Sequence, residues 1–466
     1  MSPLDPSIAT ISFLHHFEPD LHERAWASVP HPSLPLLATA HAKGVTIFSL
    51  VTLTSHSMLT GGHTRSVRSV AWEPGLSSNK LCLVTGSFDS TAGLWRYDVN
   101  GGPGLETEVV AASDCNGERS DVDQDWDFTL VLEGHESEVK SCAFSPSGAY
   151  LATCSRDKTV WIWEDVGRSN GTEDEWETQA ILNEHEGDVK AVAWCPDVPG
   201  RNARRRYSSD VLASASYDNT ARIWREDADA EWVCVSVLEG HEGTVWGVQW
   251  ESGTTPHDRF PRLLTFSSDA TARIWALEED VGDDRGDAEE LSSGSGTLGR
   301  IPNTMRPSLR ETWNCIAILP RLHQGDIYAA AWSDQSGLIA SAGCDGTIAI
   351  YREASPSCRA GSEARGATAP AATSRREAEK LQLPSLPSSA SWNLIATFSN
   401  AHGPYEINHI TWCRRYEDAI GDRRGKEEML VTTGDDGLVR TWSVTSDQLD
   451  SPANSRHMAM YTPSGS

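Results

Sequence analysis

Basic residues are scarce in this sequence. Its 466 residues include 39 Lys and Arg against 66 Asp and Glu, which gives a formal net charge of −27 with neutral histidines. Because a phosphate backbone is bound mainly by Lys and Arg that displace its counterions, this balance argues against nucleic acid as a partner. It instead predicts a soluble surface that repels other acidic chains.

Long apolar runs are also missing. No stretch approaches the ~18 apolar residues that a membrane-spanning helix needs. Residues 1–17 lack the basic and apolar regions of a secretory signal peptide. We therefore expect no membrane association and a cytoplasmic location, with the nucleus left open as a second compartment.

Clustered cysteines are the third absence. None of the ten cysteines belongs to a CxxC pair. Structural disulfides need an oxidising compartment, and zinc or iron-sulfur sites need clustered thiolates. We expect reduced cysteines that pack as small hydrophobic residues, and neither a metal site nor a cofactor.

What the sequence does contain is a repeated unit, clearest over residues 134–163. An Asp lies six residues before an aromatic residue in six copies: Asp89/Trp95, Asp157/Trp163, Asp218/Trp224, Asp269/Trp275, Asp345/Tyr351 and Asp436/Trp442. A hydroxyl residue lies four before each Asp: Thr85, Thr153, Ser214, Thr265, Ser341 and Thr432. A His precedes each set at a looser distance: His63, His135, His185, His241, His323 and His402. Short alternating strands with these anchors resemble the WD40 repeat, in which each repeat forms one four-stranded propeller blade.

A degenerate first copy brings the expected number of blades to seven. Residues 26–50 contain three alternating runs, with Ala42 at the Asp position, Ala38 at the hydroxyl position and Phe48 in place of Trp. The regular blades are predicted at residues 62–132, 134–182, 185–238, 240–319, 323–398 and 402–444. We expect residues 11–17 to form the outer strand of the seventh blade, because pairing a terminal strand there closes the ring and removes an exposed edge.

The expected fold is therefore all-β, a seven-bladed WD40 β-propeller over residues 1–445 that is closed by an N-terminal strand. Three segments, at about residues 100–124, 283–310 and 353–389, are rich in small or acidic residues and poor in aromatics. Such segments bury too little surface to offset the entropy of ordering, so we expect long disordered loop insertions there and a disordered tail over residues 446–466.

The anchors of each blade could be mistaken for a hydrolytic Ser-His-Asp triad. An enzyme needs one such site, whereas six copies of one pattern indicate a structural role. In this interpretation the His donates to the turn Asp, and the strand hydroxyl links that His to the indole of the Trp. Representative structural anchors are His135, Thr153, Asp157 and Trp163, with His241, Asp269 and Trp275. We expect no catalytic residue and no enzymatic activity.

Function must then come from residues that the fold does not require. In a propeller, the residue before each turn Asp and residues early in each first strand project onto one rim around the channel. The former set is Phe88, Arg156, Tyr217, Ser268, Cys344 and Asp435, and the latter set is Arg68, Lys140, Lys190, Trp246, Tyr328 and Asn408. Arg and aromatic clusters are typical of binding hot spots. We predict a partner-binding site formed by Arg156, Lys140, Lys190, Tyr217, Trp246 and Tyr328, with a basic spot at Arg156 that suits a carboxylate.

Two short basic segments interrupt the acidic sequence, RNARRR at residues 201–206 and RRGK at residues 423–426. Both are predicted between the first and second strands of a blade. Solvated surface, a nuclear localisation signal and a patch for an acidic partner all remain open for them.

Several longer stretches are more particular than the generic repeat. HESEVKSCAFSPSGAYLATCSRDKTVWIWE, LASASYDNTARIW and DIYAAAWSDQSGLIASAGCDGTIAIY resemble the WD40 protein of the cytosolic iron-sulfur protein assembly machinery. The resemblance implies a non-catalytic scaffold in the complex that delivers iron-sulfur clusters to extramitochondrial apoproteins. It implies an iron-only-hydrogenase-like carrier, a SufT-like targeting subunit, a HEAT-repeat adaptor and apo iron-sulfur client proteins as partners. The Arg of the family's SRDK motif, regarded as functionally important, corresponds to Arg156.

Two other kinds of WD40 protein remain as alternatives. A substrate receptor of a ubiquitin ligase often carries an Asp directly after the closing Trp. Here the residues that follow it are Arg96, Glu164, Arg225, Ala276 and Ser443. A histone or peptide reader needs an acidic channel mouth to hold Lys or Arg, whereas the rim positions predict a basic and aromatic one.

Overall fold

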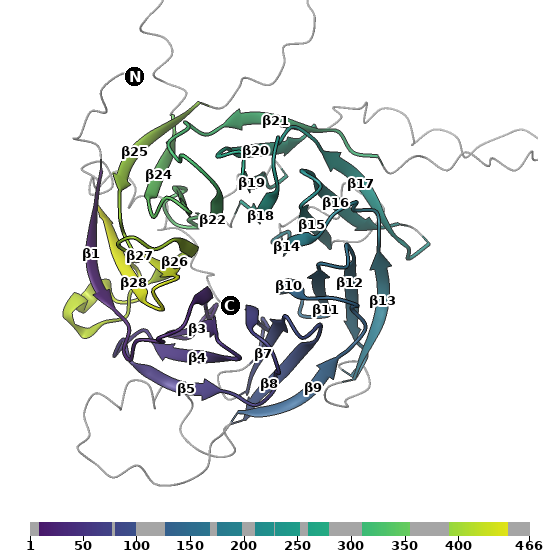
Figure 1. Cartoon of the computed structure of the whole chain (residues 1–466), viewed down its shortest axis with the longest axis horizontal. Helices are drawn as coiled ribbons and strands as arrows, with labels where there is room; N and C mark the ends of the chain where they lie inside the picture. The colour runs from purple at the N-terminus through teal and green to yellow at the C-terminus, as the bar shows by residue number, and fades with distance from the viewer. Residues whose placement is uncertain are drawn as a thin grey trace, which may run out of the picture.

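The protein is a seven-bladed β-propeller around a central channel (Figure 1). The computed structural model describes residues 9–76, 80–98, 126–167, 175–197, 210–227, 229–251, 260–278, 310–354 and 391–445. Apart from one 3-10 helix, the regular elements of these residues are strands, in seven antiparallel sheets of four. The predicted fold class is confirmed.

The strands run outward from the channel in each blade. Blade one is β2 (Ala25–Pro30), β3 (Leu36–His41), β4 (Gly44–Ser49) and β5 (Ser55–Leu59). Blade two is β6 (Val67–Trp72), β7 (Lys80–Ser87), β8 (Ala92–Asp98) and β9 (Asp127–Leu132). Blade three is β10 (Val139–Phe144), β11 (Tyr150–Ser155), β12 (Val160–Asp165) and β13 (Trp176–Leu182). Blade four is β14 (Val189–Trp194), β15 (Val211–Ser216), β16 (Ala221–Glu226) and β17 (Trp232–Leu238).

The other three blades repeat this order. Blade five is β18 (Val245–Trp250), β19 (Leu263–Ser267), β20 (Ala272–Leu277) and β21 (Trp313–Ile318). Blade six is β22 (Ile327–Trp332), β23 (Ile339–Gly343), β24 (Ile348–Glu353) and β25 (Trp392–Phe398). Blade seven is β26 (Ile407–Arg414), β27 (Glu428–Gly434), β28 (Val439–Thr445) and the N-terminal β1 (Thr10–His16).

The core lies between neighbouring blades, because both faces of each sheet are covered. The second strands are almost entirely buried, and every residue of β3 and β15 is buried, as expected for strands that pack on both sides. One core cluster joins Ile162 and Leu182 of blade three to Trp194 and Leu212 of blade four. Tryptophans at the ends of first strands donate to a carbonyl of the preceding blade: Trp72 to Val29 at 3.0 Å, Trp194 to Ala143 and Trp250 to Ala193 at 2.9 Å, and Trp412 to Ala331 at 3.1 Å.

The ring closes where the sequence predicts. β1 pairs with β28 from Thr10 opposite Thr445 to His16 opposite Arg440, and it forms the outer edge of blade seven in Figure 1. Phe17 follows directly and is buried against Phe48 of blade one, with ring centroids 5.1 Å apart. The N-terminal segment therefore joins the last blade to the first.

Blade one departs from the expectation in two respects. It has a fourth strand, β5, whereas the sequence predicted three. Only Met58 and Leu59 of this short strand are apolar, so its sequence shows no alternating pattern. Its hydroxyl anchor is Thr39 and not the predicted Ala38. In blade two, Trp95 pairs with Leu83, and the anchor Thr85 lies two residues after Leu83. In blade one, Phe48 pairs with Leu37, and Thr39 likewise lies two residues after Leu37. The turn between β3 and β4 is one residue shorter, so counting back from Phe48 assigned the wrong residue. Thr39 lies 2.7 Å from the hydroxyl of Ser28.

The connections divide between two rims. Those from first to second strand and from third to fourth strand leave one rim, which we call the lower rim. The other connections form the upper rim, and every residue in them is described. The predicted insertions, apart from Arg310, Glu353 and Ala354, and the segments at residues 201–206 and 446–466 lie outside the described residues, so these expectations stay predictions. The second basic segment begins at Arg423, the last residue of the 3-10 helix Asp418–Arg423, and Arg423 pairs with Glu427 at 2.8 Å.

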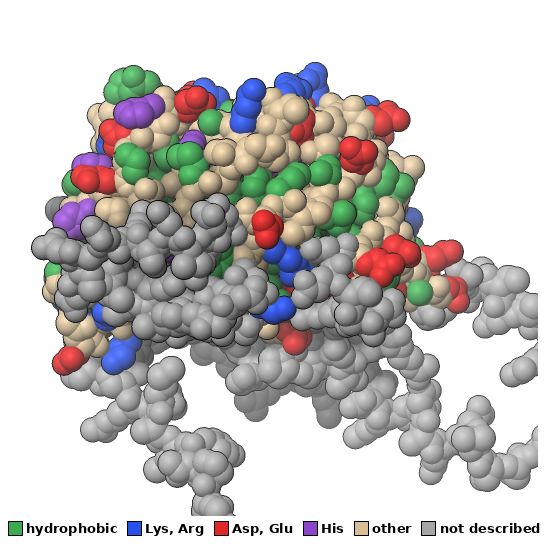
Figure 2. All heavy atoms as spheres, turned by 90° about the horizontal axis from the view of Figure 1, so that it is seen from below, with side chains coloured by type: hydrophobic (Ala, Val, Ile, Leu, Met, Phe, Trp, Pro, Cys, Tyr) green, Lys and Arg blue, Asp and Glu red, His purple; other side chains and the backbone are tan. Residues whose placement is uncertain are grey.

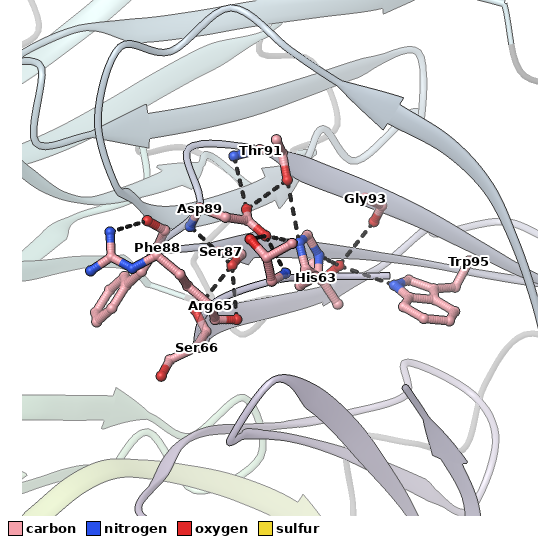
Figure 3. Close-up of polar contacts among 11 residues, drawn as sticks. His63, Arg65, Ser66, Ser87, Phe88, Asp89, Thr91, Gly93 and Trp95 are labelled. Atoms are coloured by element: carbon pink, nitrogen blue, oxygen red, sulfur yellow. Dashed lines mark hydrogen bonds and ion pairs between the residues drawn. The ribbon is translucent and has the colours of Figure 1, made fainter. Parts of the chain in front are cut away.

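The anchors form a hydrogen-bond network in each regular blade. In blade two, His63 donates from Nδ1 to Asp89 at 3.1 Å (Figure 3). Its Nε2 lies 2.7 Å from the Thr85 hydroxyl. Trp95 donates its indole N–H to the same hydroxyl at 3.0 Å. The corresponding contacts in blade three join His135 to Asp157 at 2.8 Å, His135 to Thr153 at 2.9 Å and Trp163 to Thr153 at 3.0 Å. In blade five they join His241 to Asp269 at 2.9 Å, His241 to Thr265 at 2.8 Å and Trp275 to Thr265 at 2.9 Å.

Stability is expected to fall in two steps as the pH falls. Burial would raise the pKa of Asp157, but hydrogen bonds from His135 and Thr159 outweigh it and hold that pKa well below its usual range. The other five turn aspartates are shifted in the same direction. Burial lowers the pKa of His31 and of His409 to about 4.

The sign follows from proton uptake in the unfolded chain. Between pH 6.5 and 4, the two histidines are protonated in the unfolded chain but not in the folded chain. Below about pH 4, the turn aspartates are likewise protonated first in the unfolded chain. Both effects lower the free energy of unfolding as the pH falls. Glu428 opposes the first step, because burial raises its pKa to about 7 and the folded chain therefore takes up that proton before the unfolded chain. The two histidines outweigh this one carboxyl, so the melting temperature should fall from pH 7.5 through 5.5 and 4.0 to 3.0. A maximum at pH 5 or lower would contradict the shifts.

Candidate functional site

The upper rim is built by one repeated backbone contact. The residue before each turn Asp donates its N–H to the carbonyl of the residue before the first strand of the same blade. The pairs are Phe88 to Ser66, Arg156 to Glu138, Tyr217 to Asp188, Ser268 to Thr244, Cys344 to Asp326 and Asp435 to Glu406, at 2.8–3.1 Å. This contact places the side chain of the turn beside that of the early strand residue. Figure 2 shows the propeller disc from the side, with several Lys and Arg side chains projecting from one of its two faces among Asp and Glu side chains.

Four of the six predicted site residues meet in one open pocket between blades three and four. The pocket has a volume of about 320 Å³ and is lined by Glu138, Lys140, Arg156, Asp188, Lys190 and Tyr217. Lys140 and Lys190 come from the equivalent strands β10 and β14, and Arg156 and Tyr217 come from the turns beside them. The structure thus brings together the basic residues that the sequence singled out.

Glu138 organises the blade-three side of the pocket. Its Oε2 accepts from the Lys140 ammonium at 2.6 Å, and its Oε1 accepts from Arg65 of the preceding blade at 3.1 Å. Burial would raise the pKa of Glu138, but Lys140 and Arg65 together hold it below its usual value. Burial lowers the pKa of Lys140, and the charges of Lys190 and Arg68 lower it further against the opposing effect of Glu138.

Arg156 is held more loosely than the two lysines. Its guanidinium lies 3.9 Å from Glu138 and 4.0 Å from Asp188, both beyond ordinary hydrogen-bond distance. Lys190 lies only 3.2 Å from Asp188. The side chain of Arg156 is 58% exposed, against 16% for Lys140 and 13% for Lys190. Arg156 is therefore the pocket cation whose donors are available to a partner.

Aromatic rings flank the two lysines. The Lys140 ammonium lies 4.2 Å from the centroid of Phe88. Lys190 lies 5.5 Å from the ring of Tyr217 and 5.3 Å from that of Trp246. At these distances the ring faces attract the ammonium groups and restrict their positions.

The other two predicted residues, Trp246 and Tyr328, lie farther around the rim. Their rings form an edge-to-face pair with centroids 5.3 Å apart. Trp246 donates its indole N–H to Asp326 at 3.1 Å. Burial raises the pKa of Tyr328, as do the neighbouring charges of Glu406 and Asp326. This aromatic pair continues the rim beyond the pocket.

The rim is more acidic than the sequence reading expected. Carboxylates stand directly before four first strands, at Glu138, Asp188, Asp326 and Glu406, so the channel mouth carries acidic side chains beside the predicted basic and aromatic ones. These residues were missed because only positions inside the strands and before the turn Asp were considered. Asn408 is also not available, since it is buried and donates to Ala25 at 3.1 Å and to Asp435 at 2.7 Å.

A second cluster was missed on blade one. Trp26 occupies the same place in β2 as Arg68 does in β6, and Arg24 and Arg68 lie on it with ring distances of 4.8 and 4.9 Å. Arg24 also pairs with Asp435 of blade seven. Aligning the first strands by position would have revealed Trp26, although the degenerate anchors hid this blade.

The anchor hydroxyls cannot meet a substrate. Thr85, Thr153, Ser214, Thr265, Ser341 and Thr432 all have 0% exposure. Among the described residues, no group of three or more His, Cys, Asp or Glu could hold a metal ion. Within the same part of the chain, no helix has the length and apolarity to cross a membrane. What the upper rim offers is a surface of cations, carboxylates and aromatic rings, which is suited to binding another protein.

Comparison with known proteins assigns the family. The WD domain, G-beta repeat model matches residues 50–96, 126–164, 176–225, 232–276 and 313–352. A Neurospora crassa protein named probable cytosolic iron-sulfur protein assembly protein 1 is 54% identical over 95% of this chain and 98% of its own length. The chain belongs to the cytosolic iron-sulfur protein assembly protein 1 family.

Other members of the cytosolic iron-sulfur protein assembly protein 1 family show the same coverage. The Pyricularia oryzae protein of that name is 56% identical over 93% of this chain and 96% of its own length. The Emericella nidulans protein is 39% identical over 94% of this chain and 97% of its own length. The repeat model leaves most of blade one and all of blade seven unmatched, and the structure supplies both. The resemblance inferred from the SRDK and SASYDNT stretches is confirmed.

Proposed function

We propose that this protein is a non-catalytic scaffold of cytosolic iron-sulfur protein assembly, a subunit that promotes insertion of clusters into extramitochondrial apoproteins. The observation that carries the proposal is the near-full-length identity to relatives named for this process. The cluster is the cargo of the machinery and is not held by this chain. Cytosol is the compartment that the relatives' name implies.

The proposed partners are an iron-only-hydrogenase-like carrier, a SufT-like targeting subunit, a HEAT-repeat adaptor and apo iron-sulfur client proteins. We assign partner binding to the pocket between blades three and four and to the aromatic pair beside it. Arg156 is exposed between two carboxylates, and its planar guanidinium suits a bidentate contact with a carboxylate of a partner. Since the upper rim carries no long insertion, a protein surface can reach this pocket directly.

Depletion of the protein in its own organism tests this function. Incorporation of radioactive iron into a cytosolic iron-sulfur enzyme is expected to fall several-fold, while incorporation into a mitochondrial one stays unchanged. Restoring the wild-type chain should restore the cytosolic signal. Unchanged cytosolic incorporation after depletion would refute the proposal.

A further inference from the structure

The charges inside the pocket differ in how firmly they are engaged. Among the six lining residues, three cations face two carboxylates, so the lining carries one net positive charge. Both lysines are in direct contact with a carboxylate, at 2.6 Å for Lys140 and 3.2 Å for Lys190. Arg156 makes only the long contacts of 3.9 and 4.0 Å. Within the described part of the chain, Arg156 is therefore the one pocket cation without a hydrogen-bonded carboxylate.

The two carboxylates occupy equivalent places in adjacent blades. Glu138 precedes β10 and Asp188 precedes β14, and the backbone carbonyl of each accepts the N–H of the neighbouring rim residue, Arg156 or Tyr217. Their side chains are 16% and 29% exposed, so each is partly shielded from solvent with its lysine. Neither carboxylate takes part in the anchor contacts of its blade, which join His135 and Trp163 to Thr153 in blade three and His185 to Ser214 in blade four.

We infer that Glu138 and Asp188 determine specificity by occupying Lys140 and Lys190, so that the pocket accepts a single carboxylate at Arg156 and rejects polyanions. A monoanion matches the net charge of the six lining residues; Arg65, which also contacts Glu138, lies outside the lining. A phosphate-rich or sulfate-rich chain would need several free cations, and it would meet two fixed negative charges. This inference rests on the proposed role of the pocket in binding a partner carboxylate, and it adds which anions are excluded.

A pocket without these two carboxylates would be harmful to a cytosolic scaffold. Three unpaired cations at the mouth of one channel would form a basic patch of the kind that binds nucleic acid non-specifically. With Glu138 and Asp188 in place, Lys140 and Lys190 still contribute a positive field, but their hydrogen-bond donors are directed at internal acceptors. Selectivity therefore comes from pairing the cations within the pocket.

The test is binding of fluorescently labelled heparin to the full-length protein, measured by anisotropy at 50 and 150 mM salt. Wild type is expected to bind weakly or not at all. The double variant Glu138→Gln, Asp188→Asn keeps the side-chain shapes and frees both lysines, and its affinity for heparin at 50 mM salt should rise at least about tenfold, with a steep loss at 150 mM. Each single variant should give a smaller gain.

A matched control removes two charges outside the pocket. Glu136 and Glu186 lie two residues before Glu138 and Asp188, and both are exposed. The variant Glu136→Gln, Glu186→Gln changes the net charge equally and should not bind heparin more tightly than wild type. Equal gains in both double variants, or no gain in either, would overturn the inference. If the pocket double variant melts early, the Glu138→Gln single variant gives the same decision.

This experiment uses no partner protein, so its outcome is separate from the proposed function. A gain confined to the pocket variant supports the inference even if depletion leaves cytosolic iron-sulfur enzymes unchanged. Conversely, a loss of cytosolic iron incorporation on depletion without a heparin gain would support the function and overturn the role of the two carboxylates.

Discussion

Replacing Asp157 with alanine is expected to lower the free energy of unfolding by at least about 3 kcal/mol. The carboxylate accepts four hydrogen bonds: from His135 Nδ1 at 2.8 Å, from the Glu136 N–H at 3.0 Å, and from the N–H and hydroxyl of Thr159 at 2.9 and 2.6 Å. Each donor left unpaired away from water costs about 1–3 kcal/mol, and partial access of solvent reduces the sum. Urea denaturation of the purified protein measures the change.

The neighbouring residue provides the control. Arg156 is exposed, and among the described residues its side chain makes no hydrogen bond, so Arg156→Ala should change the free energy of unfolding by less than about 0.5 kcal/mol. Asp157→Asn keeps one acceptor oxygen and should fall between Asp157→Ala and wild type. If Asp157→Ala and Arg156→Ala unfold at the same urea concentration, the assignment of anchor and rim is wrong.

Arg156→Glu is expected to weaken partner binding about 100-fold at physiological salt without unfolding the protein. A charge-assisted hydrogen bond contributes about 1.5–3 kcal/mol, and reversal of the charge adds repulsion from any carboxylate that entered the pocket. The backbone contact from residue 156 to the Glu138 carbonyl, 3.0 Å long, does not depend on the side chain.

Two measurements separate binding from folding in this variant. The melting temperature of Arg156→Glu should lie within about 2 °C of wild type, since exposed charges contribute little to stability. Arg156→Gln removes the charge without reversing it and should show an intermediate loss of binding. A drop in melting temperature equal to that of Asp157→Ala would mean that residue 156 is a structural residue.

The anchors were predictable because their spacing is local. An Asp and the aromatic six residues later lie on one β-turn and its following strand, so the same offset recurs in every regular blade. Blade one shows where a fixed offset fails. The turn after β3 is one residue shorter there, so the hydroxyl anchor is Thr39 and not a residue at the predicted position 38. Only the strand register, which depends on pairing, reveals that change.

The pocket was predictable only in part, because it forms between blades. Lys140, Arg156 and Lys190 were found from their places in the repeat. Their pairing with Glu138 and Asp188 was not, since a net charge of −27 gives no indication of which carboxylates lie beside which cations. The contact between Arg65 and Glu138 joins residues 73 positions apart in neighbouring blades.

The most direct test of the central claim is affinity capture of the tagged protein from its own cytosol, with wild type and Arg156→Glu compared by quantitative mass spectrometry. We predict that wild type recovers a hydrogenase-like carrier, a HEAT-repeat adaptor and apo iron-sulfur enzymes, and that the variant loses most of one or more of them. Recovery of cullin adaptors or histones by wild type, or equal recovery of all partners by both proteins, would contradict a scaffold that binds through the Arg156 pocket.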